Sequence, residues 1–461
     1  MTNTQFENGL FIFRRDLRIV DNICLNLLSS YCKNVYTIFI FTPEQIGSQN
    51  KYKSNASVQF MIESLQQLNK DIERKNGKLL TFYGTNESVI KECVHKLNIQ
   101  VIGFNIDITP YARVRDDHIR KMCVSLNVAL LTAYDYYLTE PGQIVTSSGE
   151  AYKKFTPYYT QARKTKIPHP STPTQLHLKA STDVIAHKID LSKTMNKFTK
   201  YNPDILVHGG REKAIEQMKI ARKNITHYAT SRDDLSKPTS HLSAFLKFGC
   251  VSIREVYHAF KSNHSFVRQL FWRDFYGQVV YNYPHVLGHA LNPTHDKLKW
   301  NYSERLFNAW ATGNTGFPLV DAAQRQLLKE GWVHNRGRMI SSSILTKILL
   351  IDWRKGEQFY AQHLVDYDVA NNNGGWGWSA GVGCDAQPWF RYFNPFLQSK
   401  EHDPMCEYIK KYIPELKDVP PKAIHHWDTE WENYTSSGYI KPVVDYKEQK
   451  EKSIRMYKNV F

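Results

Sequence analysis

The sequence lacks every arrangement of cysteines that would indicate a metal site or a disulfide framework. Its 7 cysteines are scattered and odd in number, with no CxxC pair and no His–Cys cluster at zinc spacing. Such a set is typical of reduced thiols inside a cell. We therefore expect an intracellular protein with no bound metal, and the sequence leaves cytoplasm, nucleus and virion open.

Apolar runs long enough to cross a membrane are missing as well. None approaches the ~18 residues that a bilayer requires. The N-terminal MTNTQFENG lacks the basic and apolar regions of a signal peptide. Internal repeats and a low-complexity tail are also absent. These absences predict a soluble globular protein with no membrane partner.

Acidic residues are scarce relative to basic ones. The chain has 44 Asp and Glu against 60 Lys and Arg, a formal net charge of +16. An excess of this size favours a polyanionic partner, most simply nucleic acid, although a basic proteome or a solubility effect explains it equally well. At 461 residues the chain is long enough for two or more domains.

The first 130 residues alternate strand and helix patterns. Between the second and third strands, residues 58–72 carry apolar side chains at helical spacing. No GxGxxG follows the first strand, so the dinucleotide fingerprint is absent. The alternation predicts an α/β, Rossmann-like domain with a parallel sheet. The five expected strands are residues 10–13, 35–41, 78–83, 100–104 and 128–131.

A stretch rich in Pro, Ser, Thr and Lys follows, and beyond it the pattern is mostly helical. Such composition predicts a long connection over the surface. We expect an α/β domain over residues 1–132, a connector over 133–200 and an all-α domain over 201–461.

Four charged or aromatic segments have an ordinary structural interpretation and a functional one. FRRDLRIVDN (13–22) is a solvated charge cluster or a ligand and interdomain site after the first strand. TSHLSAFLKFG (239–249) offers hydroxyls that cap a helix or hold a diphosphate at its N-terminus. QLFWRDFYGQ (269–278) and GWVHNRGRM (331–339) combine indoles with arginines, as an aromatic core rim or as a site for an extruded base.

One segment is too particular for an ordinary interpretation. Residues 371–381, NNNGGWGWSAG, lie within HLVDYDVANNNGGWGWSAGVGCDAQPWFRYFNP (363–395). With the four segments above, YKKFTPY (152–158), VDAAQRQL and LLIDWRKGE, it closely resembles the photolyase/cryptochrome family, most of all the class I cyclobutane pyrimidine dimer photolyases. The resemblance runs along nearly the whole chain in the same order.

This resemblance implies an α/β antenna domain and a helical domain that binds FAD. The residues that would hold the cofactor are Tyr228, Thr239, Ser240, Leu242, Ser243, Arg338, Asp366, Asp368 and Asn372. Arg338 and Asp366 would form an ion pair over the isoalloxazine, Asp368 would lie at its polar edge and Asn372 would face N5. Trp376, Trp353 and Trp300 would carry an oxidising hole from the flavin to the surface. Without the resemblance, all three indoles are ordinary core residues.

The resemblance also implies a cavity for damaged DNA. Trp272 and Trp378 would wall it, and Gln269 stands where many cyclobutane-dimer photolyases carry a glutamate. The remaining contacts to the lesion or its phosphates would come from Arg273, Asn335, Arg336, Met339, Arg391 and Gln398. Tyr111 and Ala112 replace the polar pair of folate-binding members, which leaves deazaflavin, a second flavin or no antenna chromophore open.

The implied function is a light-driven DNA lyase that acts as a monomer on double-stranded DNA containing pyrimidine dimers. Reduced FAD, excited by light, would give one electron to a cyclobutane dimer. The alternatives are a blue-light-sensing cryptochrome without repair activity and a photolyase for the six-four photoproduct. Six-four enzymes carry two histidines where Asn335 and Met339 stand, and neither of these can donate a proton. His334, one residue earlier, is expected to point away from the cavity.

Overall fold

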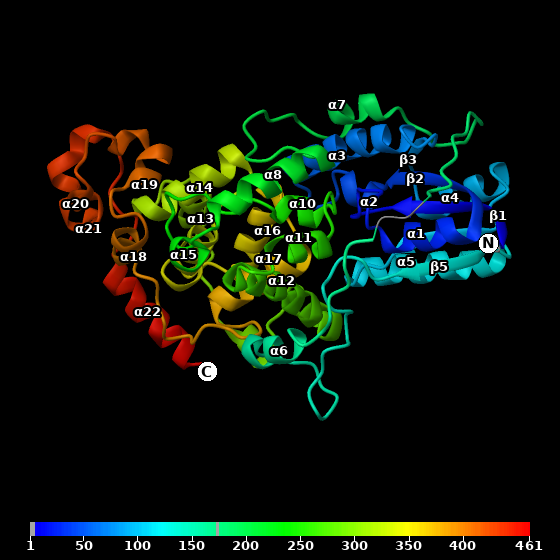
Figure 1. Ribbon diagram of the computed structural model, residues 1–461. Coiled ribbons are helices and arrows are strands. Elements are labelled where there is room, and N and C mark those ends of the chain that lie inside the picture. The colour runs from blue at the N-terminus through cyan, green and yellow to red at the C-terminus, as the bar shows by residue number, and fades with distance from the viewer. Residues whose placement is uncertain (1–4, 172–174) are drawn as a thin grey trace.

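The structure is a computed structural model that describes residues 5–171 and 175–461. Its N-terminal part is a five-stranded sheet in the order β3-β2-β1-β4-β5, parallel throughout (Figure 1). The strands are β1 (Phe6–Phe13), β2 (Cys32–Phe41), β3 (Leu79–Tyr83), β4 (Val101–Asn105) and β5 (Ala129–Ala133). The expected strands and the parallel α/β domain are thus confirmed.

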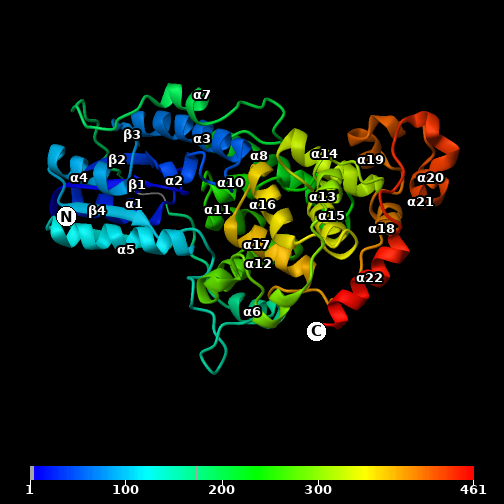
Figure 2. The same cartoon turned by 180° about the vertical axis from the view of Figure 1, so that it is seen from behind.

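Helices cover both faces of this sheet because alternate strand residues point to opposite sides. Phe11 and Phe13 pack with α1 (Ile23–Tyr31) and α3 (Asn55–Glu73). Leu10 and Ile12 pack with α4 (Asn86–Lys96) and α5 (Pro110–Ser125). The short α2 (Pro43–Ile46) follows β2 at the carboxyl end of the sheet. The carboxyl ends of the strands face the helical domain (Figure 2), so residues that follow β1 and β2 lie at the domain boundary.

The expected connector is only partly a surface connection. Its helix α6 (Phe155–Ala162) packs on α12 of the helical domain through ring contacts between Phe155, Trp272 and Phe275. Later, Ile189 donates its N–H to Thr81 of β3, beside the short helices η1 (Leu191–Lys193) and α7 (Thr194–Phe198). The connector therefore ties both domains together.

The remaining chain is helical, as expected. Its helices are α8 (Arg211–Asn224), α9 (Tyr228–Ser231), α10 (Ser243–Lys247), α11 (Ile253–Phe260), α12 (His264–Asn282), α13 (Glu304–Ala311), α14 (Pro318–Glu330), α15 (Asn335–Lys347), α16 (Trp353–His363), α17 (Val369–Ala380), α18 (Pro395–His402), α19 (Glu407–Tyr412), α20 (Pro421–Ile424), α21 (Trp427–Glu430) and α22 (Tyr446–Lys458). In both views α12, α16 and α17 occupy the middle of this domain. No helix among residues 5–171 and 175–461 combines the length and apolar character that crossing a bilayer requires.

The glycine-rich segment forms the central helix α17. Asp368 begins it by accepting the N–H of Asn371, and Gly381 ends it in a left-handed conformation at φ +80°. Two of its glycines are required by packing: a Cβ on Gly374 would meet the Tyr276 ring at 2.1 Å, and one on Gly377 would meet the Gly383 backbone at 3.1 Å. The helix therefore approaches its neighbours more closely than side chains would allow.

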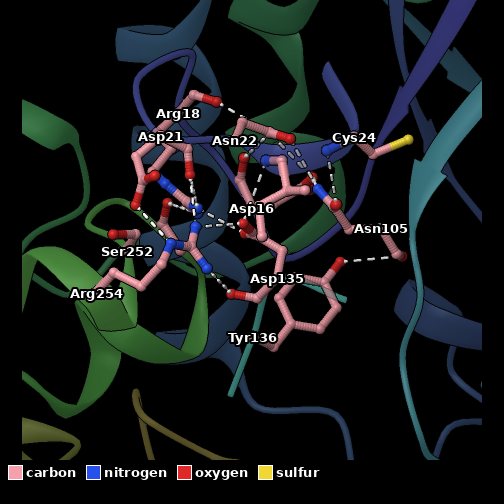
Figure 3. Close-up of polar contacts among 12 residues, drawn as sticks. Asp16, Arg18, Asp21, Asn22, Cys24, Asn105, Asp135, Tyr136, Ser252 and Arg254 are labelled. Atoms are coloured by element: carbon pink, nitrogen blue, oxygen red, sulfur yellow. Dashed lines mark hydrogen bonds and ion pairs between the residues drawn. The ribbon is translucent and has the colours of Figure 1, made fainter. Parts of the chain in front are cut away.

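The charged segment 13–22 is a buried interdomain network, not a solvated cluster. Arg18 pairs with Asp135 at 2.6 Å, and Arg254 of α11 reaches both Asp135 (2.7 Å) and Asp21 (2.9 Å) (Figure 3). All four side chains are at most 6% exposed. Because buried charges are tolerated only when they are paired, this network fixes how the two domains meet.

Candidate active site

Helix α15 and the segment between α16 and α17 bring together the arginine and aspartate expected as an ion pair. Arg338 Nη2 lies 2.9 Å and 3.2 Å from the two carboxylate oxygens of Asp366, and Arg338 Nε donates to the carbonyl of Val333. The pairing is confirmed. Since the arginine side chain is 28% exposed and the aspartate side chain 4%, the pair has its guanidinium on the open side.

Asn372, on α17, has its amide oriented by the neighbouring helix α16. Its Nδ2 donates to the backbone carbonyl of Glu357 at 3.0 Å, which leaves Oδ1 as an acceptor. The next residue, Asn373, donates to the Glu357 carboxyl at 3.1 Å. Burial raises the pKa of Glu357 to about 7 despite that hydrogen bond. Glu357 was not identified from the sequence, because only the fold brings it beneath the asparagines.

Beside Asn372, one glycine of α17 faces empty space. A Cβ built on Gly375 would meet nothing within 4 Å, in contrast to Gly374 and Gly377. Residues three apart on a helix share a face. Asn372 Oδ1 and the bare backbone at Gly375 therefore border the same face of α17, which is open at Gly375.

Asp368, expected at the polar edge of the flavin, has both carboxylate oxygens engaged by the protein. Oδ2 lies 2.6 Å from Arg15 Nη2, and Oδ1 accepts from the backbone and side chain of Asn371. Burial on its own would raise the pKa of Asp368, but Arg15, Lys247 and Arg273 hold it well below its ordinary value. A direct contact with the flavin stays a prediction.

The hydroxyl segment before α10 does not cap that helix, contrary to the ordinary interpretation. The N-cap is Leu242, without a side-chain cap bond, and α10 is only five residues long. Gln217 holds the segment in place by donating to the Ser240 carbonyl at 2.8 Å. In the described part of the chain, no hydrogen bond engages the Thr239 or Ser243 hydroxyl. These two hydroxyls are thus available to a ligand, as the diphosphate prediction requires.

Tyr228, expected beside the same ligand, is the first residue of α9. Its ring packs edge-on against Phe266 of α12. Burial raises the pKa of Tyr228 to about 12, so its hydroxyl stays protonated and able to donate. Its contact with the cofactor stays a prediction.

The three tryptophans expected as a hole-transfer chain are all buried. Trp376 of α17 lies against Gly356 of α16, where a Cβ would meet its ring at 2.2 Å, one turn from Trp353. The bridge between Asn301 and Ile351 brings Trp300 to the start of the same helix. Their electron-transfer role stays a prediction.

Two further rings beside Trp376 were not identified from the sequence. Trp310 and Tyr360 contact it edge-on at 5.9 Å and 5.2 Å between ring centroids. Both are fully buried, and each donates a hydrogen bond to the protein: Trp310 Nε1 to Ser341, and the Tyr360 hydroxyl to Gln324. Nothing in the sequence distinguishes them from core aromatics.

The first turn of α15 presents Asn335 and Met339 on one face, as expected from their spacing. Asn335 Nδ2 lies 3.3 Å from the Met339 sulfur. His334 is buried and turned away from that face, because its Nδ1 accepts the N–H of Arg336 and caps the helix. Arg336, expected on a phosphate, pairs with Asp233 at 2.8 Å.

The three site residues expected on α12 lie in three different environments. Trp272 stacks on Phe155 at 3.7 Å, so one face of the indole is already covered. Arg273 is corrected: its guanidinium bonds the Tyr136 carbonyl and lies over the Tyr137 ring, at the domain interface and not at a DNA surface. Gln269 is half-buried and donates to the Ser265 carbonyl of its own helix at 3.3 Å.

The chain between α17 and α18 carries the last candidates. Trp378 lies 6.5 Å from Phe393, and Arg391 is exposed between them in sequence. Gln398 of α18 donates to Glu401, and its buried Oε1 has no partner among the described residues. This segment and the first turn of α15 supply the exposed polar groups of the expected DNA surface.

A separate cavity of about 590 Å³ lies at the carboxyl ends of β1 and β2, against the helical domain. Arg14, Arg15 and Arg115 line it, and each has a buried guanidinium nitrogen without a hydrogen-bond partner among the described residues. Burial and the charge of Arg15 lower the pKa of the neighbouring Lys247 to about 8. The cavity thus presents unsatisfied positive groups. Its apolar wall is formed by Ile12, Phe13, Phe39, Ile40, Val58, Met61 and Phe248.

Comparison with known proteins defines the class of this fold and site. Residues 10–175 match the family model described as DNA photolyase, and residues 266–459 match the FAD binding domain of DNA photolyase. The deoxyribodipyrimidine photo-lyase of Synechococcus sp. is 34% identical in an alignment of 437 residues that covers 90% of this chain and 89% of the relative. That of Alkalihalophilus pseudofirmus is 33% identical, over 97% of each chain. The chain therefore belongs to the DNA photolyase family, and its helical part is an FAD-binding domain.

Solved structures agree. The archaeal photolyase from Sulfolobus tokodaii, a structure with two FAD molecules, superimposes with a TM-score of 0.87 at 36% identity, over 98% of this chain and 100% of its own. A class III photolyase from Agrobacterium tumefaciens gives 0.91 at 29%, over 99% and 98%. The cryptochrome of Synechocystis gives 0.89 at 26%, over 99% and 100%. The expected two-domain fold is confirmed.

Proposed function

We propose that the protein is a light-dependent DNA repair enzyme that splits cyclobutane pyrimidine dimers with an electron from photoexcited reduced FAD. The observation that carries the proposal is the open surface on α17, where Asn372 Oδ1 and the bare Gly375 backbone lie side by side. The curated relatives named deoxyribodipyrimidine photo-lyase support it at 30–34% identity over nearly the whole chain.

The residues at this surface fit FAD. Arg338 and Asp366 supply one donor and one acceptor beside the ring, and Thr239, Ser243 and Tyr228 supply hydroxyls for its diphosphate and ribityl chain. Bound there in its reduced form, FAD supplies the electron that light makes available. Asn372 Oδ1 would then accept a hydrogen bond from a protonated ring nitrogen, since the bond from one Asn372 N–H to the Glu357 carbonyl fixes the amide and leaves Oδ1 free.

The choice of lesion rests on Asn335 and Met339. Splitting a cyclobutane ring needs an electron and no proton donor, whereas repair of a six-four product needs an acid near neutral pKa. Neither residue can donate a proton, and His334 is committed as a helix cap. The pair instead packs and hydrogen-bonds against an intact pyrimidine dimer.

We also propose that the 590 Å³ cavity holds a second chromophore with anionic or carbonyl oxygens. The three arginines and Lys247 that line the cavity would bind those oxygens, while the apolar wall takes the ring. The positive charge of the cavity is compatible with both a flavin and a deazaflavin. Denaturing the purified protein and separating its chromophores by chromatography tests this, and FAD alone at one mole per mole would contradict it.

Two oligonucleotides decide the function, one with a single cyclobutane dimer and one with a single six-four product. Each is illuminated with reduced protein and read by chromatography, with a dark control. We expect loss of the cyclobutane dimer only. Repair of the six-four product alone would overturn the lesion assignment. Repair of neither would favour the second candidate, a blue-light receptor, for which the likeness to the Synechocystis cryptochrome is the specific observation.

A further inference from the structure

Lys347, the last residue of α15, is a fully buried lysine whose amine lies against two backbone carbonyls. Its Nζ donates to the Arg391 carbonyl at 2.9 Å and to the Pro388 carbonyl at 3.4 Å. Burial, and then the charge of Arg391, lower the pKa of Lys347 to about 7. No acidic group of the described chain contributes to that pKa, so the carbonyls are its main partners.

Those two carbonyls belong to the loop between α17 and α18, residues 381–394. The loop buries Val382, Cys384, Gln387 and Phe393 but exposes its tip: Phe390 is 64% exposed, and Arg391 is exposed beside it. Residues 382–385 of the loop are held by backbone hydrogen bonds to Gly377 and Lys153, whereas Lys347 and Gln387 bond to residues 388–391. Gln387 donates its N–H to the Trp378 carbonyl at 3.3 Å and its Nε2 to the Arg391 carbonyl at 3.4 Å.

The C-terminal helix α22 forms the other wall of this arrangement. Lys347 and Lys450 each lie 5.6 Å from the centroid of the Tyr392 ring, whose hydroxyl donates to Ser453 at 3.0 Å. Tyr457 stacks parallel to Trp389 at 6.3 Å, and Lys347 lies 5.9 Å from its ring. The groups that face the Lys347 amine are therefore Arg391, Tyr392 and Tyr457, with Lys450 beyond Tyr392.

We infer that Lys347 is a positioning residue that fixes the 381–394 loop and directs the Arg391 side chain outward to a DNA phosphate. Its ammonium holds the loop from beneath by the Arg391 carbonyl, and its positive charge repels the guanidinium of the same residue toward solvent. The inference rests on the proposed function, because it requires DNA to bind at this loop.

A methionine would fill the same volume, so packing alone does not require a lysine here. Burying an ammonium costs free energy that two carbonyl hydrogen bonds only partly offset. The charge instead couples the loop to its ligand. When a phosphate neutralises Arg391, the repulsion on Lys347 falls and its affinity for a proton rises, so DNA binding and protonation of Lys347 favour each other.

The test uses FAD-loaded protein and duplex DNA with one cyclobutane dimer. The variants are Lys347→Met, Arg391→Ala, the double variant and Lys450→Met, which removes an exposed lysine on the outer side of Tyr392. We expect Lys347→Met to weaken DNA binding about tenfold, the scale of one phosphate contact, and Lys450→Met to weaken it less than threefold. FAD content and light-driven reduction should stay at the wild-type level. Adding Lys347→Met to Arg391→Ala should change affinity little, because both act through one side chain.

A pH profile keeps the inference testable even if Lys347→Met does not fold. At constant ionic strength, wild-type affinity should fall several-fold from pH 6 to pH 8.5, and the fall should be much smaller in Arg391→Ala. Additive losses in the double variant, or equal pH profiles for wild type and Arg391→Ala, would overturn the role of Lys347. If wild-type protein does not bind the damaged duplex at all, the proposed function fails instead.

Discussion

Arg15 and Asp368 meet across the domain boundary, with 2.6 Å between Nη2 and Oδ2 and both side chains less than a tenth exposed. Arg15 follows β1 and lines the 590 Å³ cavity, while Asp368 begins α17, the helix that carries Asn372 and Trp376. One ion pair therefore joins the cavity of the α/β domain to the helix against which the flavin ring is proposed to lie.

Asp368→Asn tests that pair. An asparagine still caps α17, but Arg15 loses a charged partner in a buried place, so we expect about 3 kcal/mol less stability to denaturant at pH 7. Because the folded-state pKa of Asp368 is depressed, the wild-type contribution is present above its unfolded pKa and is lost only as pH falls through the folded value.

Glu7→Gln is the matched control for this change. It removes the exposed ion pair between Glu7 and Lys33, whose side chains are 53% and 59% exposed, and should cost less than about 1 kcal/mol. Equal losses in the two variants would show that burial of the Arg15–Asp368 pair does not matter.

The fold could be predicted from the sequence because its signals are local. Alternating apolar runs gave the five strands, and the composition change after residue 160 marked the connector. The site residues came from the family resemblance, which paired Arg338 with Asp366 and singled out Asn335 and Met339, and the structure shows both pairs in contact.

What the sequence could not reveal depends on contacts between distant segments. Arg273 is an arginine next to an indole in the sequence, but the fold turns it toward Tyr136, more than a hundred residues away. Lys247 and Glu357 have no local pattern at all, and they become notable only through burial among charges. Most of the residues that the sequence did not reveal are therefore notable because segments distant in the sequence bury them.

The glycines of α17 provide a direct test of the flavin position. Gly375→Leu should fill the open surface beside Asn372 and abolish FAD binding, measured by flavin fluorescence on titration of apoprotein. The apoprotein itself should keep its thermal midpoint, because the new Cβ meets nothing within 4 Å and a leucine is a better helix former than glycine.

Gly374→Ala is the contrasting variant. Its Cβ would meet the Tyr276 ring at 2.1 Å, so the apoprotein should be destabilised by about 1–3 kcal/mol from overpacking. Normal FAD affinity in Gly375→Leu would show that the flavin ring does not lie against α17 at Gly375.

Trp376→Phe should block light-driven reduction of oxidised FAD and leave repair by pre-reduced protein largely intact, because in the proposed chain the indole supplies an electron to the flavin and does not touch the lesion. Trp310→Phe is the control, since Trp310 also contacts Trp376 but lies outside the proposed chain through Trp353 and Trp300. Absorption during illumination measures both. Reduction at the wild-type rate in Trp376→Phe, or loss of reduction in Trp310→Phe, would mean that the electron-transfer chain runs through other residues.

DNA binding should be electrostatic in its nonspecific part, given the net charge of +16 and the exposed Arg391. Log affinity for undamaged duplex should fall linearly with log salt, with a slope of roughly −0.9 per phosphate neutralised. Arg391→Ala should reduce the magnitude of that slope by about 1. Fluorescence anisotropy at four salt concentrations measures it, and a wild-type slope near zero would exclude phosphate contacts as the source of affinity.

His334 should make the protein sensitive to mild acid. His334 is 3% exposed, and burial lowers its pKa to about 4. The charge of Asp233 opposes this shift, while His241, Arg336 and Arg338 add to it. Protonation also destroys the Nδ1 acceptor that caps α15. With a folded pKa below the unfolded value of about 6.5, the contribution of His334 is complete above pH 6.5 and is lost as pH falls toward 4.

Between pH 7 and pH 5 this linkage amounts to about 2 kcal/mol of unfolding free energy. His334→Asn keeps an oxygen cap for α15 without a titrating group, so its stability should change less over the same interval. His289→Gln, which alters a histidine whose side chain is 67% exposed, should keep the wild-type pH dependence. Urea unfolding followed by tryptophan fluorescence at both pH values measures all three proteins. Parallel losses in wild type and His334→Asn would mean that another buried group, such as His241, controls the acid response.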